Sequence, residues 1–348
     1  MLSIIGCAGQ RGPDATQPST MDERLAAAFE VLEKDAMPVV VAFSHDGGPA
    51  VVREFGAFRD DGIAPEKSLV DMGSITKTVT AVAVSKLVDQ SAVRLDETLA
   101  DVFPEVPADK AGITVEQLLT HTSGFTEAVG DDPEEITRDE LLRRAFASPL
   151  VDAPGARYGY SNVGYSVLAA ILEIRSGRSY GEYLRDEVLA PAGLHGIGYW
   201  GSYDDALSLR SAHGDSIFDA SWGGHDASWH LIGNGGLVTT AETFVRFLQA
   251  VTGGDILSST SLERLLHPHV AEDPEGTSFY GYGLVVQDVP ELGRFYWHDG
   301  GNDVFSAEWS IHGDLDDVIF VAGREMTAGA STASEAMSVL REHLYAKE

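Results

Sequence analysis

A serine and a lysine stand three residues apart where a strand-like run gives way to a helical one, in the segment MGSITK at residues 72–77. This spacing puts the Lys77 amine one helical turn from the Ser74 hydroxyl. A serine hydroxyl is a poor nucleophile until a base takes its proton, and a helix N-terminus supplies N–H donors where an oxyanion forms. The pair predicts a nucleophile with its base. The alternative is a capping serine followed by a surface lysine, although among six lysines only Lys77 follows a serine at this distance.

A second group of polar residues ends a glycine-rich loop. Tyr160-Ser161-Asn162 comes directly before a helical run that starts near residue 163. A tyrosine at this place can project into a cleft between a helical and an α/β region. Asn162 either binds substrate or caps the helix. It is one of only three asparagines in the chain.

A third group lies at the end of a predicted strand and reads His298-Asp299-Gly300-Gly301. A glycine pair at a strand edge lets a ligand approach the backbone closely. A backbone N–H at this edge could complete an oxyanion hole opposite Ser74. The alternative for His298 is a buried sheet histidine with its hydrogen bonds satisfied.

Taken together and in this order, the three motifs resemble those of a serine hydrolase family. Ser-x-x-Lys, Tyr-x-Asn and His-x-Gly are similar to the motifs of class C β-lactamases, D-alanyl-D-alanine carboxypeptidases, D-aminopeptidases and β-lactamase-like esterases. Residues 118–124, 154–165 and 235–241 also look like this family, and the resemblance covers roughly residues 22–345.

The resemblance implies a role for each matched residue. Ser74 would be the acylated nucleophile, and Lys77 and Tyr160 would share its proton as general base. Tyr160 would return a proton to the leaving group, and water would then hydrolyse the acyl-enzyme. The N–H groups of Ser74 and Gly301 would form the oxyanion hole, and Asn162 would bind the substrate's carbonyl or amide.

One motif departs from the β-lactamase pattern. Where those enzymes usually carry Lys-Thr-Gly, this chain has His298-Asp299-Gly300, which we expect to contact substrate through His298 and Gly300. A histidine is largely neutral at pH 7, so a drug carboxylate would be received less well. This favours small esters first and D-amino-acid amides or peptides second, over β-lactams. A β-lactamase, or a penicillin-binding module that acylates slowly without turnover, remains as the alternative.

The composition excludes other classes of function. Of 348 residues, 24 are basic and 54 acidic, for a formal net charge of −30. Such a surface opposes binding to nucleic acid or to anionic lipid. We therefore expect a small-molecule or short-peptide substrate, with the oligomeric state left open. No cofactor and no metal is expected, because the histidines at 225, 230, 267 and 269 lack cysteines or carboxylates at ligand spacing. The aromatic loop 221–230 could line the pocket or pack on the sheet edge.

The N-terminus is unusual for its single cysteine. Ile4-Ile5-Gly6-Cys7 resembles a bacterial lipobox, but the basic and long apolar regions of a signal are missing. Either the chain start truncates a longer signal, or the match is chance. The first reading predicts a cell-envelope or secreted protein, with membrane attachment only through a lipidated Cys7. The second predicts a cytoplasmic one.

These residues need a scaffold, and the hydrophobic periodicity predicts an α+β fold of the β-lactamase/transpeptidase type that the resemblance implies. One antiparallel sheet would be built from both chain ends and flanked by helices, with a mostly helical region inserted. The expected organisation is a flexible segment 1–20, a sheet domain 21–94 plus 235–348, and a helical region 95–234. The predicted strands are 38–44, 50–58, 68–72, 282–287, 295–298, 305–311 and 318–322. The predicted helices are 21–34, 75–89, 115–121, 138–147, 163–176, 179–189, 241–251, 258–266 and 331–345.

Overall fold

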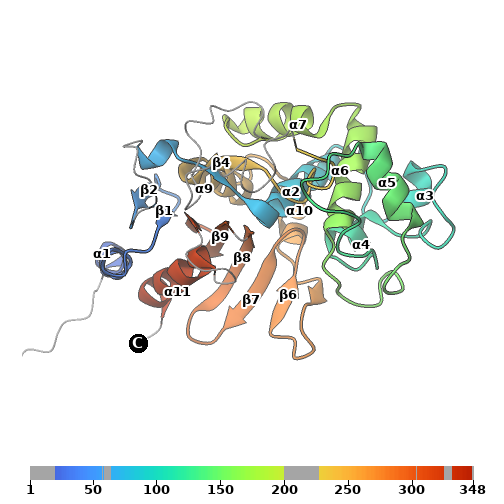
Figure 1. The fold of residues 1–348 in the computed structure, drawn as a ribbon. Helices are drawn as coiled ribbons and strands as arrows, with labels where there is room; N and C mark the ends of the chain where they lie inside the picture. The colour runs from blue at the N-terminus through green and yellow to red at the C-terminus, as the bar shows by residue number, and fades with distance from the viewer. Residues whose placement is uncertain are drawn as a thin grey trace, which may run out of the picture.

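The computed structural model describes residues 20–56, 58, 64–199, 227–302, 304–324 and 331–346. Its main sheet has eight antiparallel strands in the order β2-β1-β10-β9-β8-β7-β6-β5 (Figure 1). The strands are β1 (Val39–Ser44), β2 (Val51–Glu54), β5 (Val270–Ala271), β6 (Ser278–Tyr280), β7 (Val285–Val289), β8 (Gly293–Gly301), β9 (Phe305–His312) and β10 (Asp317–Arg324). Because β1 pairs with β10, the two ends of the chain meet in one sheet, as the sequence predicts.

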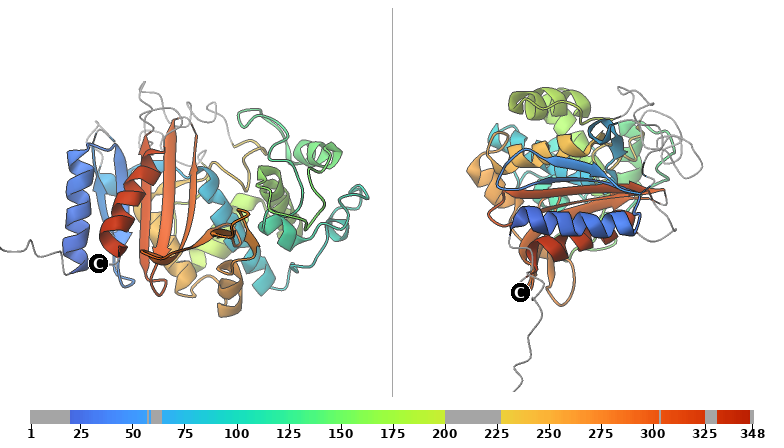
Figure 2. Two further views of the ribbon diagram at one scale, coloured as in Figure 1. Left: turned by 90° about the horizontal axis from the view of Figure 1, so that it is seen from below. Right: turned by 90° about the vertical axis from the view of Figure 1, so that its left-hand side faces the viewer.

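Helices cover both faces of this sheet, which explains why the neighbouring strands β1 and β10 are apolar on both sides. On one face lie α1 (Met21–Lys34) and α11 (Thr332–Tyr345), side by side in Figure 2. Val41 of β1 packs into the apolar cluster beneath these two helices. Its neighbour Ala42 points to the opposite face and joins the larger cluster. That cluster includes α9 (Ala241–Thr252), whose apolar residues contact β1 and β10.

The helical region surrounds α2 (Thr76–Asp89), which is buried on almost every side. The other helices are α3 (Leu99–Val102), α4 (Val115–Leu119), α5 (Arg138–Ala147), α6 (Asn162–Ser176), α7 (Tyr180–Tyr183) and α10 (Ser259–Leu265), with single turns η1 (Pro65–Lys67), η2 (Gly73–Ile75) and η4 (Ala190–Ala192) and a π-helical turn η3 (Leu184–Leu189). A small second sheet pairs β3 (Leu69–Asp71) with β4 (Val238–Thr240). It leads the chain into η2 and α2.

Several predicted elements are wrong in their bounds. The strand predicted at 50–58 ends at Glu54, because the chain turns at Gly56, where φ is +55° and a Cβ would lie 2.2 Å from the Ala36 carbonyl oxygen. The strand predicted at 282–287 begins only at Val285, after Gly283 at φ +68°. The single helix predicted at 179–189 divides into α7 and the π-helical η3. The strand β4 was not predicted.

The N-terminal predictions fall mostly outside the described residues, and Cys7 is among those not described. Thr20 is described and caps α1, accepting the Glu23 N–H at 3.3 Å. The bounds of the two predicted domains stay a prediction. Among the described helices, none has both the length and the apolar composition that a membrane span requires.

Candidate active site

Ser74 lies in the tight turn η2 between β3 and α2. Gly73 has a φ of +47°, a conformation that a side chain would strain, and its N–H donates to the buried Asp71 carboxylate at 2.7 Å. The turn packs directly on the end of β8. A Cβ added to Gly73 would lie 2.5 Å from the Gly301 nitrogen, and one added to Gly300 would lie 2.5 Å from the Ser74 nitrogen. The two predicted oxyanion donors, the N–H groups of Ser74 and Gly301, are therefore neighbours.

Lys77 is fully buried beside this turn. Its Nζ donates to Ser74 Oγ at 3.0 Å and to the Asn234 carbonyl oxygen at 2.8 Å. Burial lowers the pKa of Lys77 to about 7, against the opposing charges of Asp132, Asp299 and Glu127. A surface lysine is thereby excluded. At neutral pH a large share of this amine is unprotonated and able to accept a proton.

Tyr160 completes the group. Its ring centroid lies 4.7 Å from Lys77 Nζ. Burial raises the pKa of Tyr160 well above its ordinary value, and a hydrogen bond with Ser74 only partly opposes this. The phenol therefore keeps its proton near pH 7. Of the two predicted bases, the lysine has the pKa suited to take the serine proton in the resting site.

Asn162 is the first residue of α6 and does not cap it. The cap is Ser161, whose Oγ accepts the Gly164 N–H at 3.0 Å. The capping alternative for Asn162 is therefore wrong. Its backbone N–H donates to the Glu127 carbonyl at 2.9 Å, while its Oδ1 is buried without a partner among the described residues. The predicted contact between Asn162 and substrate stays a prediction.

His298 is buried in β8, with both ring nitrogens engaged. Its Nδ1 lies 2.6 Å from the Asp299 carbonyl oxygen, which can only accept, so the proton is on Nδ1. Nε2 then accepts the Tyr280 hydroxyl at 3.1 Å. Burial lowers the pKa of His298 to about 4, so the ring is neutral. The satisfied sheet histidine describes this geometry, and no ring nitrogen is left for direct substrate contact. The side chain of Asp299 is 59% exposed.

Sequence reasoning missed two contributors to the site. One is the backbone carbonyl of Asn234, held over α2 by a segment in which Gly233 and Leu237 also bond to α2 threonines. A backbone contact 157 residues away has no local signal. The other is His121, whose ring centroid lies 4.5 Å from that of Tyr160. Its signal was present in the resembling stretch 118–124, to which no role was assigned.

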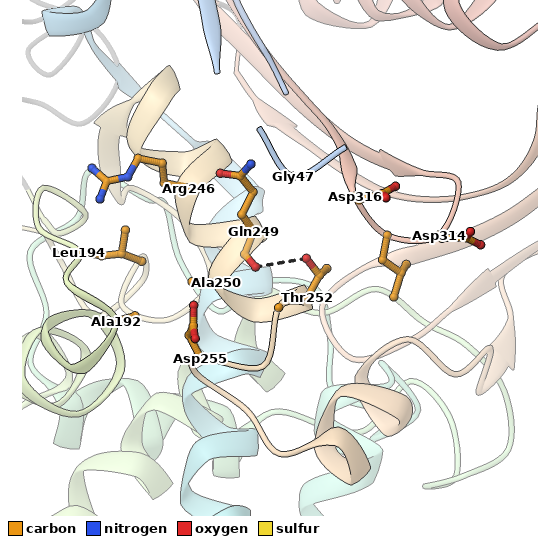
Figure 3. Close-up of a pocket in the computed structure, with 12 residues that line it drawn as sticks. Gly47, Ala192, Leu194, Arg246, Gln249, Ala250, Thr252, Asp255, Asp314 and Asp316 are labelled. Carbon is orange, nitrogen blue, oxygen red and sulfur yellow. Dashed lines mark hydrogen bonds between the residues drawn. The ribbon is translucent and has the colours of Figure 1, made fainter. Parts of the chain in front are cut away.

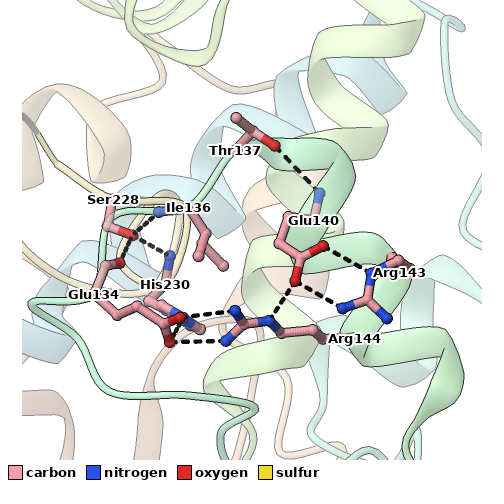
Figure 4. A network of polar contacts seen from close by, with 8 residues as sticks. All are labelled: Glu134, Ile136, Thr137, Glu140, Arg143, Arg144, Ser228 and His230. Atoms are coloured by element: carbon pink, nitrogen blue, oxygen red, sulfur yellow. Dashed lines mark hydrogen bonds and ion pairs between the residues drawn. The ribbon is translucent and has the colours of Figure 1, made fainter.

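Only the last part of the predicted aromatic loop 221–230 is described, and it is tied to the helical region. His230 Nε2 lies 3.3 Å from Glu134 Oε2. Glu134 forms two 2.7 Å hydrogen bonds with Arg144 of α5 (Figure 4). The Ile136 N–H donates to Ser228 Oγ at 3.2 Å. His230 is thus occupied by an ion-pair network.

One described group could bring a histidine and two carboxylates to a metal ion: His45, Asp46 and Asp317. These side chains already bind one another, with His45 Nδ1 only 2.6 Å from Asp317 Oδ1. The Asp317 hydrogen bond raises the pKa of His45, which favours an ion pair between the end of β1 and the start of β10. Nearby, a pocket of about 520 Å³ is lined by Arg246, Gln249 and others (Figure 3). None of its lining residues belongs to the Ser74 site.

Comparison with known proteins identifies the family. A family model described as "Beta-lactamase" matches residues 23–322. The chain belongs to the beta-lactamase family. Penicillin-binding protein 4* of Bacillus subtilis is 27% identical over 316 residues, 80% of this chain and 66% of that protein. The chain thus spans about two thirds of that relative's length. Esterase EstB of Burkholderia gladioli is 25% identical over 81% of this chain and 83% of its own.

Solved structures confirm the expected fold. The D-amino acid amidase of Ochrobactrum anthropi SV3, complexed with D-phenylalanine, superposes with a TM-score of 0.77. It is 20% identical, and the match covers 92% of this chain and 99% of the amidase. At the position where the motif resemblance suggests a lysine in β-lactamases, this chain has the neutral, fully bonded His298.

Proposed function

We propose that this chain is a serine hydrolase that forms an acyl-enzyme on Ser74, with Lys77 as the general base. The observation that carries the proposal is the buried Lys77 amine, 3.0 Å from Ser74 Oγ and with its pKa lowered to about 7. A structural lysine would be paired with a carboxylate or exposed. This amine instead bonds a hydroxyl and a carbonyl, neither of which carries charge.

The steps follow from the positions of the protons. Neutral Lys77 accepts the Ser74 proton as Oγ bonds to the substrate carbonyl carbon. The oxygen that becomes negative lies between the N–H groups of Ser74 and Gly301. Tyr160 gives its phenolic proton to the leaving group and recovers one from Lys77. Water then hydrolyses the ester on Ser74 by the reverse sequence of proton transfers, and the carboxylic acid leaves.

Small esters are the first substrate class that we propose. A β-lactam drug carries a carboxylate that needs a cation at the β8 edge, and this chain places there a neutral His298 and an exposed Asp299. The carboxylates of Glu127 and Asp132, in the loop between α4 and α5, and of Asp299 in β8 act on Lys77 and repel anions as well. A neutral ester needs no cation at this position and is not repelled by these carboxylates.

Amides of D-amino acids are the second candidate. The same three carboxylates would attract the ammonium group of an unblocked amino acid. The buried, unpartnered Asn162 Oδ1 could accept an N–H from such a substrate. The chain shares its fold with a D-amino acid amidase to which it is 20% identical, and this likeness concerns the fold.

The test compares wild type with S74A on p-nitrophenyl butyrate, D-alanyl p-nitroanilide and a chromogenic cephalosporin. S85A, on the same helix but outside the site, is the matched control. We expect ester turnover to fall by at least ~1,000-fold in S74A and to persist in S85A. Preferential cleavage of the anilide would select the second candidate. An S74A protein with full turnover would refute the proposal. A stable adduct on Ser74 in intact-mass spectra, without turnover, would indicate a penicillin-binding module instead.

A further inference from the structure

We infer that His121 is a positioning residue that fixes the catalytic Tyr160 by holding the backbone on both sides of it. The His121 carbonyl oxygen accepts the Gly159 N–H at 2.8 Å. Its Nδ1 accepts the Ser161 N–H at 3.1 Å. The backbone N–H groups of the residues before and after Tyr160 are thus bound by one residue from the segment after α4.

The side chain adds a contact to the ring of Tyr160 itself. The ring centroids of His121 and Tyr160 lie 4.5 Å apart with an interplanar angle of 38°. Tyr165 and Tyr280 contact the other sides of the imidazole, at 5.0 and 4.7 Å. The imidazole is 1% exposed, so it has no freedom to follow a displaced tyrosine.

The hydrogen bond to Ser161 requires one particular form of the histidine. An Nδ1 that accepts carries no proton, so the ring is neutral with its proton on Nε2. That Nε2 is buried without a hydrogen-bond partner among the described residues. Leaving a buried donor unpaired costs free energy, typically ~1–3 kcal/mol. The position of the ring therefore leaves its own Nε2–H without a hydrogen bond. What this position provides is the Nδ1 acceptor for the Ser161 N–H.

The backbone of His121 is also unusual. Its φ is +56°, in the left-handed region that histidine and asparagine tolerate better than most residues. This conformation turns the chain so that carbonyl and side chain both face the 159–161 segment. The carbonyl of the next residue, Thr122, accepts the Gly155 N–H at 2.7 Å and anchors the start of the same loop.

This arrangement gives His121 a role through Tyr160. The phenol must reach both Ser74 and the Lys77 amine, and Lys77 Nζ lies only 4.7 Å from the centre of its ring. A shift of the tyrosine by about 1 Å would misplace the proton donor, which typically costs on the order of 100-fold in rate. His121 touches neither the nucleophile nor the base in any described contact.

Three substitutions separate the acceptor from the backbone conformation. H121N keeps an oxygen acceptor at the same number of bonds from Cα as Nδ1, and asparagine tolerates a positive φ. H121G adopts this backbone freely but has no acceptor. H121L fills space and has neither property. H267L, at a histidine outside the site, is the control.

The inference rests on the proposed function, so the readout is kcat and KM for the ester, with melting temperature measured in parallel. We expect kcat to fall ~100-fold in H121G and H121L, with KM within threefold of wild type, and H121N to retain kcat within about tenfold. Equal losses in H121N and H121G, following the loss in melting temperature, would overturn the inference in favour of packing alone. Should H121L not fold, the pair H121N and H121G still decides.

A double-mutant cycle tests whether the effect passes through Tyr160. In a Y160F background, H121G should lower kcat by less than threefold, because the proton donor is already absent. A full further loss would overturn the inference. Failure of the proposed function is seen separately, since S74A would then keep its activity whatever the His121 variants do.

Discussion

The buried Lys77 amine gives the proposed hydrolase a pH dependence that can be worked out beforehand. Its pKa falls from 10.5 to about 7 on burial. Only the neutral amine accepts the Ser74 proton, so kcat/KM should rise with pH and level off above 7. With this pKa, about half of the amine is neutral at pH 7 and only ~1% at pH 5. The specificity constant at pH 5 should therefore be about one hundredth of its plateau, on a slope of tenfold per pH unit.

The carboxylates near the amine provide the perturbation. Asp132 is half-buried, and its charge raises the pKa of Lys77. D132N removes that charge, so the acid limb should move to lower pH and the rate at pH 5 should increase. D131N removes the same charge from the exposed neighbouring residue, which is not among the groups that act on Lys77, and should leave the limb in place.

The assay is initial-rate hydrolysis of a p-nitrophenyl ester from pH 4.5 to 8.5, at constant ionic strength and with the S74A rate subtracted. Constant ionic strength matters because salt screens the Asp132 charge. A profile that is flat from pH 5 to 8 would refute Lys77 as the base. A midpoint near 4 would point instead to His298, whose pKa is lowered to about that value. Equal shifts in D131N and D132N would refute the local electrostatic reasoning.

Three further outcomes follow from the packing and burial of particular residues. G300A should lower kcat at least ~100-fold, because its Cβ would lie 2.5 Å from the amide of the nucleophile, while G181A, with nothing within 4 Å, should be silent in the same assay. For K77M, we compare the unfolding free energy with that of wild type at two pH values by urea unfolding. The difference in favour of K77M should be ~3 kcal/mol larger at pH 6 than at pH 9.5. The sign follows because the folded pKa of Lys77 lies below 10.5, so the wild type loses stability as pH falls toward 7. E308Q, which breaks a 2.8 Å ion pair with the nearly buried Arg341, should cost ~3 kcal/mol of unfolding free energy, and an unchanged urea midpoint would contradict this.

Local spacing made part of the site predictable from the sequence. Ser74 and Lys77 are one helical turn apart, so their approach depends only on a helix forming there, and the structure has that helix. The sheet built from both chain ends was predictable because apolar strands occur near both ends. Helix α1 has the predicted bounds, and Thr20 caps its start.

The rest depends on contacts between distant segments. The carbonyl of Asn234 and the ring of His121 reach the site only when the chain has folded, and neither contact leaves a periodicity. The strand β4 has only three residues, which is too short for its hydrophobic alternation to predict a strand. It forms because it pairs with β3. The sequence places Ser161 and Asn162 next to each other at the start of α6, and either residue could cap that helix. Capping preferences for serine and asparagine are nearly equal and cannot decide between them.

The position of Lys77 shows why a site on one helix needs the whole fold. Burial lowers its pKa, and burial is supplied by the segment at Asn234 and by the aromatic rings of Tyr160 and Tyr165, 4.7 and 6.0 Å away. The carboxylates of Asp132, Asp299 and Glu127 act in the opposite direction. The pKa of about 7 is therefore a balance between desolvation and negative charge. A bound ammonium would neutralise the carboxylates without rehydrating the amine, so it would move the balance toward the neutral base. In such a site, a bound cationic substrate would lower the pKa of Lys77 and so favour the neutral amine that takes the Ser74 proton. A bound anionic substrate would raise that pKa and keep Lys77 charged.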